Sequence, residues 1–110
     1  MNPLFERLLA HGPVVTDGAW GTEIQARGLP VGGCPDAWNL ANPDAVDDIG
    51  RAYVEAGSRV ILTNTFGANR FRLEPFGLAD RAEELNRAGA EISRRAAGAR
   101  AKVFGSMGWL

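Results

Sequence analysis

The sequence predicts an α/β fold in which parallel strands alternate with helices. Three short runs, at residues 13–16, 59–63 and 102–106, have the β-branched or apolar character of strands. Each run follows a segment whose apolar residues recur at helical spacing. The run at 59–63 is nearly unbroken in apolar residues, which is typical of a strand buried on both faces of a parallel sheet. Helices and strands therefore alternate along the chain, and this order favours parallel strands joined by helical crossovers.

The first predicted helix begins at Asn2 and Pro3 and carries an apolar side formed by Leu4, Phe5, Leu8 and Leu9. Asparagine caps free N–H groups, and proline is tolerated at the first helical position. Gly12 is a plausible left-handed stop. The strand at 13–16 follows and ends at the turn dipeptide Asp17-Gly18.

Residues 19–41 are mixed, with a helical turn expected near 22–26 and an irregular stretch at 28–35 that is broken by glycine and proline. Asn42 and Pro43 repeat the helix-start pattern, and Gly57 is placed to end that helix. A loop is expected at 64–77.

The longest helix is predicted at 78–97, before the last strand. Its buried stripe is expected to consist of Leu78, Ala82, Leu85, Gly89, Ile92 and Ala96. Glu83 and Arg87 have the spacing of a favourable surface ion pair on its outer side.

Composition excludes several classes of protein. The 110 residues suffice for one small domain, and a net charge of −1 without a basic patch argues against nucleic-acid binding. We expect no membrane span, because every apolar stretch is far too short, and no secretory signal, because residues 1–10 lack its pattern. The single cysteine, Cys34, rules out an internal disulfide, and we expect a cytoplasmic protein.

Ligands of α/β proteins bind at the carboxyl ends of the strands, so the candidate site lies at residues 17–22, 63–70 and 105–108. Asp17 could hold a ligand's ammonium group, although the residues alone favour a simple Asp-Gly turn. Thr63, Asn64 and Thr65 could contact a ligand or cap the following loop, with little to choose between the two.

Other chemistry is not indicated. Cys34 has no partner at metal-ligand spacing, and nothing marks His11 as catalytic, so the sequence predicts neither a metal site nor a catalytic residue in this segment. Gly18 and Gly21 form neither a P-loop nor a dinucleotide fingerprint, which disfavours a flavodoxin-like domain.

A series of motifs nevertheless resembles one family. Each motif is weak alone, but five of them occur in the expected order across nearly the whole chain, at residues 17–25, 39–46, 56–58, 63–70 and 105–108. The series is similar to the homocysteine S-methyltransferase family, and especially to the homocysteine-binding module of cobalamin-dependent methionine synthases.

The resemblance implies that this α/β chain is the first three βα units of a (β/α)8 TIM-type barrel. It implies methyl transfer to the thiol of homocysteine, giving methionine, with zinc as the metal that activates the thiol. The methyl donor or a methylcobalamin module is the implied partner. Asp17 and Gly18 would hold the amino acid end of homocysteine, Thr63 would line the same pocket, and Asn64 and Thr65 would contribute.

The resemblance also implies that residues 1–110 are an N-terminal fragment, because a full barrel takes about 250 residues. The family's zinc cysteines come from later strands, and Cys34 is not one of them. An alternative is therefore a non-catalytic fragment that another chain completes. Open sheet edges would favour self-association of such a fragment.

Overall fold

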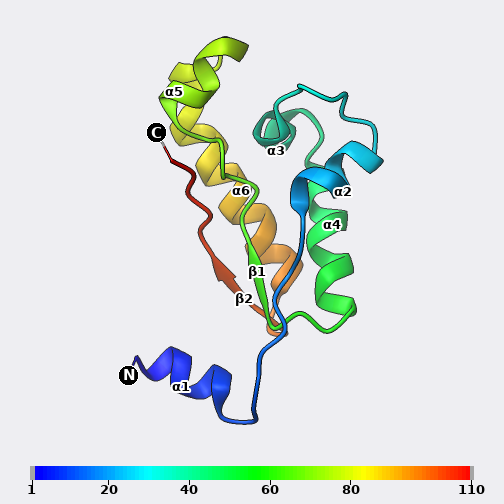
Figure 1. Cartoon of the computed structure of the whole chain (residues 1–110), viewed down its shortest axis with the longest axis vertical. Helices are drawn as coiled ribbons and strands as arrows, with labels where there is room; N and C mark the ends of the chain where they lie inside the picture. The colour runs from blue at the N-terminus through cyan, green and yellow to red at the C-terminus, as the bar shows by residue number, and fades with distance from the viewer. Residues whose placement is uncertain (1, 110) are drawn as a thin grey trace.

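A computed structural model describes residues 2–109 and shows a small mixed α/β domain (Figure 1). Two strands and a series of helices follow one another along the chain. The elements are α1 (Pro3–Leu9), α2 (Trp20–Ala26), η1 (Pro35–Ala37), α3 (Trp38–Ala41), α4 (Pro43–Glu55), β1 (Val60–Leu62), α5 (Arg70–Leu73), η2 (Glu74–Phe76), η3 (Ala79–Arg81), α6 (Ala82–Ala97) and β2 (Lys102–Phe104).

The strands are parallel, as the sequence predicts. β1 pairs with β2 with Ile61 opposite Val103, and an isolated parallel bridge joins Thr16 to Val60 on the other side of β1. β1 therefore lies between the segment at 13–17 and β2, and the carboxyl ends of all three point to the end of the molecule that carries α5 (Figure 1).

The first predicted strand, at 13–16, is wrong as a regular strand, because it is reduced to that single bridge. The N–H of Arg59 donates a hydrogen bond to the carbonyl of Val15 at 2.8 Å. The N–H of Asp17 donates to the carbonyl of Val60 at 3.1 Å. The next donor on β1, the N–H of Leu62, is taken by the Asp17 carboxylate at 2.7 Å instead of by a backbone carbonyl. A side chain thus ends the ladder one step early.

The predicted helix starts are confirmed, with one correction. The Asn2 side chain accepts a hydrogen bond from the N–H of Leu4 at 2.7 Å and caps α1. Asn42 precedes α4 but makes no such side-chain bond, so the start signal consists of Pro43 and the acidic Asp44 in the first turn. Gly57 adopts a φ of 112°, which only glycine adopts easily, and turns the chain from α4 towards β1.

Several short helices were not predicted. η1 and α3 occupy residues 35–41, and α5 and η2 lie inside the predicted loop at 64–77. α6 begins at Ala82 rather than at residue 78, because the one-turn η3 precedes it. These elements are one turn long, too short for a hydrophobic period to reveal them.

α4 and α6 pack against each other and both contact β1 (Figure 1). Their shared core includes Val46, Ile49 and Ile92, each at most 2% exposed. The predicted surface pair on α6 is confirmed, because Arg87 contacts Glu83 at 3.0 Å. None of the helices within residues 2–109 combines the length and apolarity that crossing a bilayer requires.

Candidate functional site

A pocket of about 320 Å³ opens where the carboxyl ends of the strands meet. Its walls come from the turn after residue 17, η1, the loop after β1 and the segment after β2. Four of the five predicted site residues line it, namely Gly18, Thr63, Asn64 and Thr65. These predicted residues thus lie together at the carboxyl end of the sheet.

Asp17 lies beside this lining, between the pocket residues Gly18 and Leu62, and is half-buried. One carboxylate oxygen, Oδ2, accepts hydrogen bonds from the indole N–H of Trp20 at 2.6 Å and the backbone N–H of Leu62 at 2.7 Å. The carboxylate therefore ties the turn to β1 and fixes Trp20 on the pocket wall. Its other oxygen makes no hydrogen bond within residues 2–109.

The two predicted threonines join the loop after β1 to the segment after β2. The hydroxyl of Thr65 donates to the carbonyl of Ser106 at 2.8 Å, which leaves Thr63 to donate to Thr65 across 2.6 Å. The N–H of Ser106 then donates to the Thr63 hydroxyl oxygen at 3.0 Å. Both hydroxyl protons are thus used within the protein, and a ligand would find only acceptor lone pairs here.

Asn64 is held by a buried network that the sequence did not reveal. Its amide nitrogen donates to the carbonyl of Pro35 and to Oδ1 of Asn39, both at 2.9 Å. The amide nitrogen of Asn39 donates in turn to the carbonyls of Asn64, at 2.9 Å, and Leu85, at 3.0 Å. Asn39 of α3, only 2% exposed, therefore connects the strand end to α6, and Asn64 connects it to η1.

Gly89 of α6 allows this close approach. A methyl group there would lie 2.7 Å from both Asn39 Nδ2 and Thr65 Cγ2, and neither atom is free to move. Alanine gains about 1 kcal/mol in helix propensity, but overpacking typically costs about 1–3 kcal/mol. We expect Gly89→Ala to lower the free energy of unfolding by about 1 kcal/mol, whereas Gly21→Ala in α2, where nothing lies within 4 Å, should not. Urea unfolding of both variants tests this, and equal stability would refute it.

Asp36 is a pocket residue that the sequence analysis missed. It is 6% exposed, and its Oδ2 accepts a hydrogen bond from the N–H of Gly67 at 3.0 Å. Burial raises the pKa of its carboxyl, while hydrogen bonding and the nearby charge of Arg72 act in the opposite direction. Its position after Cys34-Pro35, between an irregular stretch and a helix, was the available signal.

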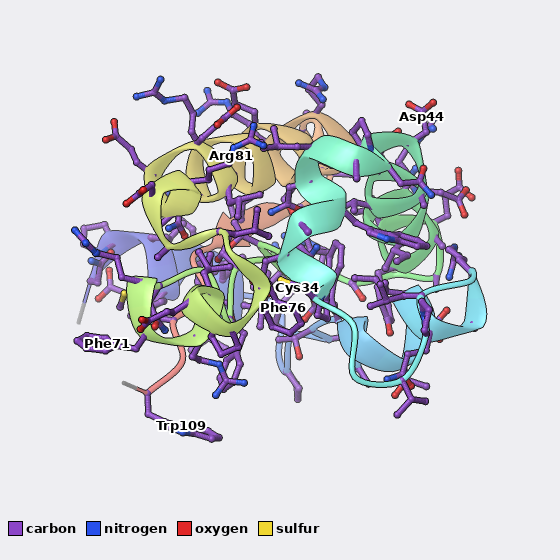
Figure 2. The ribbon with its side chains drawn as sticks, turned by 90° about the horizontal axis from the view of Figure 1, so that it is seen from above. Cys34, Asp44, Phe71, Phe76, Arg81 and Trp109 are labelled. Atoms are coloured by element: carbon purple, nitrogen blue, oxygen red, sulfur yellow. The ribbon has the colours of Figure 1, made fainter. Side chains whose placement is uncertain are left out.

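Cys34 is a solitary, buried thiol in the loop before η1, and it lies near the middle of the view in Figure 2. Burial raises the pKa of this thiol, which makes the thiolate less accessible. It packs against Leu73 and Leu85 in the core. Within residues 2–109, no three His, Cys, Asp or Glu side chains are grouped to hold a metal ion.

Comparisons with known proteins agree with this arrangement. A family model described as homocysteine S-methyltransferase matches residues 14–110. The methionine synthase of Mycobacterium tuberculosis is 37% identical over 113 residues, which cover 92% of this chain and 10% of that protein. The methionine synthase of Mycobacterium leprae is 38% identical over 114 residues, which cover 91% of this chain and 9% of that protein.

The fold also matches part of a solved enzyme. The metallated form of the homocysteine methyltransferase MmuM from Escherichia coli matches with a TM-score of 0.80 and 26% identity over 97% of this chain and 41% of that one. Its oxidized form gives a TM-score of 0.80 at 24% identity, covering 98% and 41%. The chain thus spans less than half of these relatives. It belongs to the homocysteine S-methyltransferase family.

Proposed function

We propose that this chain is the first part of a (β/α)8 TIM-type barrel that transfers a methyl group to the sulfur of homocysteine, giving methionine. The observation that carries the proposal is the pocket at the strand ends, lined by Gly18, Thr63, Asn64 and Thr65, in a chain that the family model matches from residue 14 to residue 110. Active sites of such barrels lie at this end of the strands.

In this proposal, Asp17 receives the ammonium group of homocysteine on the carboxylate oxygen that makes no bond within the described chain. The residues that line the pocket beside Asp17 would contact the amino acid end of homocysteine, namely Gly18, Thr63, Asn64 and Thr65. The thiol gives up its proton to solvent, and the sulfur then forms a bond to the donor's methyl carbon. The donor's own bond to that carbon breaks, and its electron pair stays with the donor. One donor that the sequence resemblance implies is methylcobalamin.

Zinc does not fit the residues described here. Cys34 is buried and has no second ligand beside it, and no metal-holding group exists within residues 2–109. We therefore propose that the zinc cysteines belong to strands outside this sequence and derive no step from the metal. The single cysteine also suits a reducing compartment, and we propose the cytoplasm.

A second candidate is a non-catalytic fragment that another chain completes. This candidate is favoured by how little of its relatives the chain covers, since it spans 10% of the mycobacterial methionine synthase and 41% of the solved methyltransferase. Such a fragment would bind homocysteine weakly or only with its partner chain. Binding measurements on the 110-residue chain and on the full-length protein separate the two candidates.

The proposal is tested by Asp17→Asn in the full-length protein. Asparagine can still accept the hydrogen bonds from Trp20 and Leu62, but it lacks the charge that pairs with an ammonium group. Since charged hydrogen bonds contribute about 1.5–3 kcal/mol, homocysteine affinity should fall roughly 10- to 100-fold while the melting temperature changes little. Titration calorimetry and thermal unfolding measure both quantities.

Asp47→Asn is the matched control, because Asp47 pairs with Arg51 on the surface of α4 and should leave affinity unchanged. An Asp17→Asn variant that melts much earlier yet binds homocysteine as tightly as wild type would show that Asp17 is only a turn residue.

A further inference from the structure

Asp36 carries the one side chain, among the described residues that line the pocket, that can accept a proton. The only other ionisable side chain of that lining is Arg72, which stays protonated. The remaining lining residues are uncharged, and the hydroxyl protons of Thr63 and Thr65 are already donated within the protein. A ligand that must lose a proton in this pocket therefore meets a single internal acceptor.

The Asp36 carboxylate is held by one oxygen, while the other has only a weak partner. Oδ2 accepts the hydrogen bond from the N–H of Gly67 at 3.0 Å. Oδ1 has a thiol as its neighbour, because Sγ of Cys34 lies 3.9 Å away. Since a thiol is a weak donor and a carboxylate oxygen has two lone pairs, Oδ1 can accept a second contact. The protein thus already places one S–H group against this oxygen.

The absence of a side chain at residue 67 keeps the approach to Oδ1 open. A methyl group at Gly67 would lie 2.9 Å from Oδ1 of Asp36 and 3.4 Å from Nε of Arg72, so it would fill the space between these two groups. Gly67 itself lines the pocket. A small group of a bound ligand therefore has a way to Oδ1 from the pocket side.

The surroundings of Asp36 make its carboxylate a stronger base than an exposed one. The side chain is 6% exposed, and this burial raises the pKa of the carboxyl. The N–H of Gly67, the charge of Arg72 and the thiol of Cys34 act in the opposite direction, but the net shift of the pKa is upward. Arg72 and Cys34 are the charged and titratable groups that face the carboxyl. A carboxyl with a raised pKa inside a pocket is typical of a group that takes up protons.

Arg72 is held where it influences Asp36 without pairing with it. Its guanidinium carbon lies 5.5 Å from the centre of the Phe66 ring and 5.4 Å from that of the Trp109 ring, which projects at the edge of the molecule in Figure 2. Among the described residues, no ion pair joins Arg72 to a carboxylate within 4.0 Å. The two rings thus keep the cation from neutralising Asp36.

We propose that Asp36 accepts the proton of the homocysteine thiol as the sulfur is methylated. The proposal rests on the proposed function, which supplies the thiol, and it puts Asp36 in the place of solvent as the first acceptor. The S–H bond breaks, its proton moves to Oδ1, and its electron pair stays on sulfur, which bonds to the methyl carbon. The leaving group departs with the electron pair of its bond to that carbon, and Asp36 then passes the proton to solvent. The thiol needs a proton acceptor whether or not a metal also binds its sulfur.

The test is Asp36→Asn in the full-length protein, since asparagine still accepts the hydrogen bond from Gly67 but cannot take up a proton. Bound homocysteine and bound selenohomocysteine are methylated with methyl iodide, a small neutral donor that needs no binding site of its own. The selenol is ionised at neutral pH and needs no base. At neutral pH we expect methylation of the thiol to slow roughly 100-fold in the variant, and methylation of the selenol to keep its wild-type rate.

The pH dependence separates a proton acceptor from a structural residue. The wild-type rate should fall as the pH drops through the pKa of Asp36, because the protonated carboxyl no longer accepts. The rate of Asp36→Asn should instead rise about tenfold per pH unit, in step with the ionised fraction of the thiol. Asp80→Asn, on the exposed one-turn η3 outside the pocket lining, is the matched control and should behave like wild type with both substrates.

The outcomes are distinct. Wild type that fails to bind homocysteine in calorimetry would overturn the proposed function itself. Wild type that binds it, but methylates the thiol no faster than free homocysteine reacts or no faster than Asp36→Asn does, would overturn the role of Asp36 alone. Equal slowing of thiol and selenol would also overturn that role, because Asp36 would then only support the shape of the pocket.

Discussion

Asn39→Leu is expected to destabilise the full-length protein by about 3 kcal/mol. Leucine is similar in size but removes every hydrogen bond of the Asn39 amide, leaving the carbonyl of Asn64 and one donor of its side chain unpaired. The carbonyl of Leu85 loses a bond as well. A buried polar group that loses its partner costs about 1–3 kcal/mol, and water cannot easily replace Asn39, which is 2% exposed.

Asn86→Leu is the control for this prediction. Asn86 also donates two side-chain hydrogen bonds, to the carbonyls of Ala68 and Ala82 at 2.8 Å, but it is exposed, so water can take over. Its loss should cost less than about 1 kcal/mol. Urea unfolding measures the free energy of unfolding of both variants, provided that its dependence on urea concentration keeps the wild-type slope. Equal destabilisation by the two substitutions would show that burial of the Asn39 network contributes nothing.

The sequence predicted the fold class because the elements that define it carry strong local signals. Val60 and Ile61 form an apolar run, and α6 has a helical stripe long enough to be read from spacing. The segment at 13–17 was overestimated, because no local pattern shows that the Asp17 side chain will take the N–H of Leu62. That competition depends on a residue 45 positions away.

The site was predictable to the extent that it follows from topology. Parallel strands bring their carboxyl ends together, which placed Gly18 and Thr63 at one pocket. Asp36 and Arg72 could not be found in the same way, since they lie on one-turn elements within predicted irregular regions. Asn39 was noted only as part of a family motif, because its importance comes from partners on two other segments.

The 110-residue chain by itself is expected to self-associate. The outer edge of β2 has no strand partner within residues 2–109, and the segment at 13–17 is paired on one side only. Unpaired edges invite other chains. The radius of gyration, 14.3 Å, exceeds the roughly 13 Å of a compact domain of this length, which fits an open arrangement with a small core. Completion of the proposed barrel would remove both edges.

A charge at the edge should suppress this association. Val15 is 62% exposed on the segment at 13–17, so Val15→Lys places a cation beside the unpaired backbone without filling the core. Val31, 89% exposed in the loop between α2 and η1, provides the same substitution away from any edge. Light scattering at rising concentration should show that Val15→Lys lowers the mean mass and Val31→Lys does not. Since charge alone would act equally at both positions, the difference isolates the edge. A wild-type chain that stays monomeric, with slow amide exchange in β1, β2 and the segment at 13–17, would instead identify a self-sufficient α/β domain and remove the need for a completed barrel.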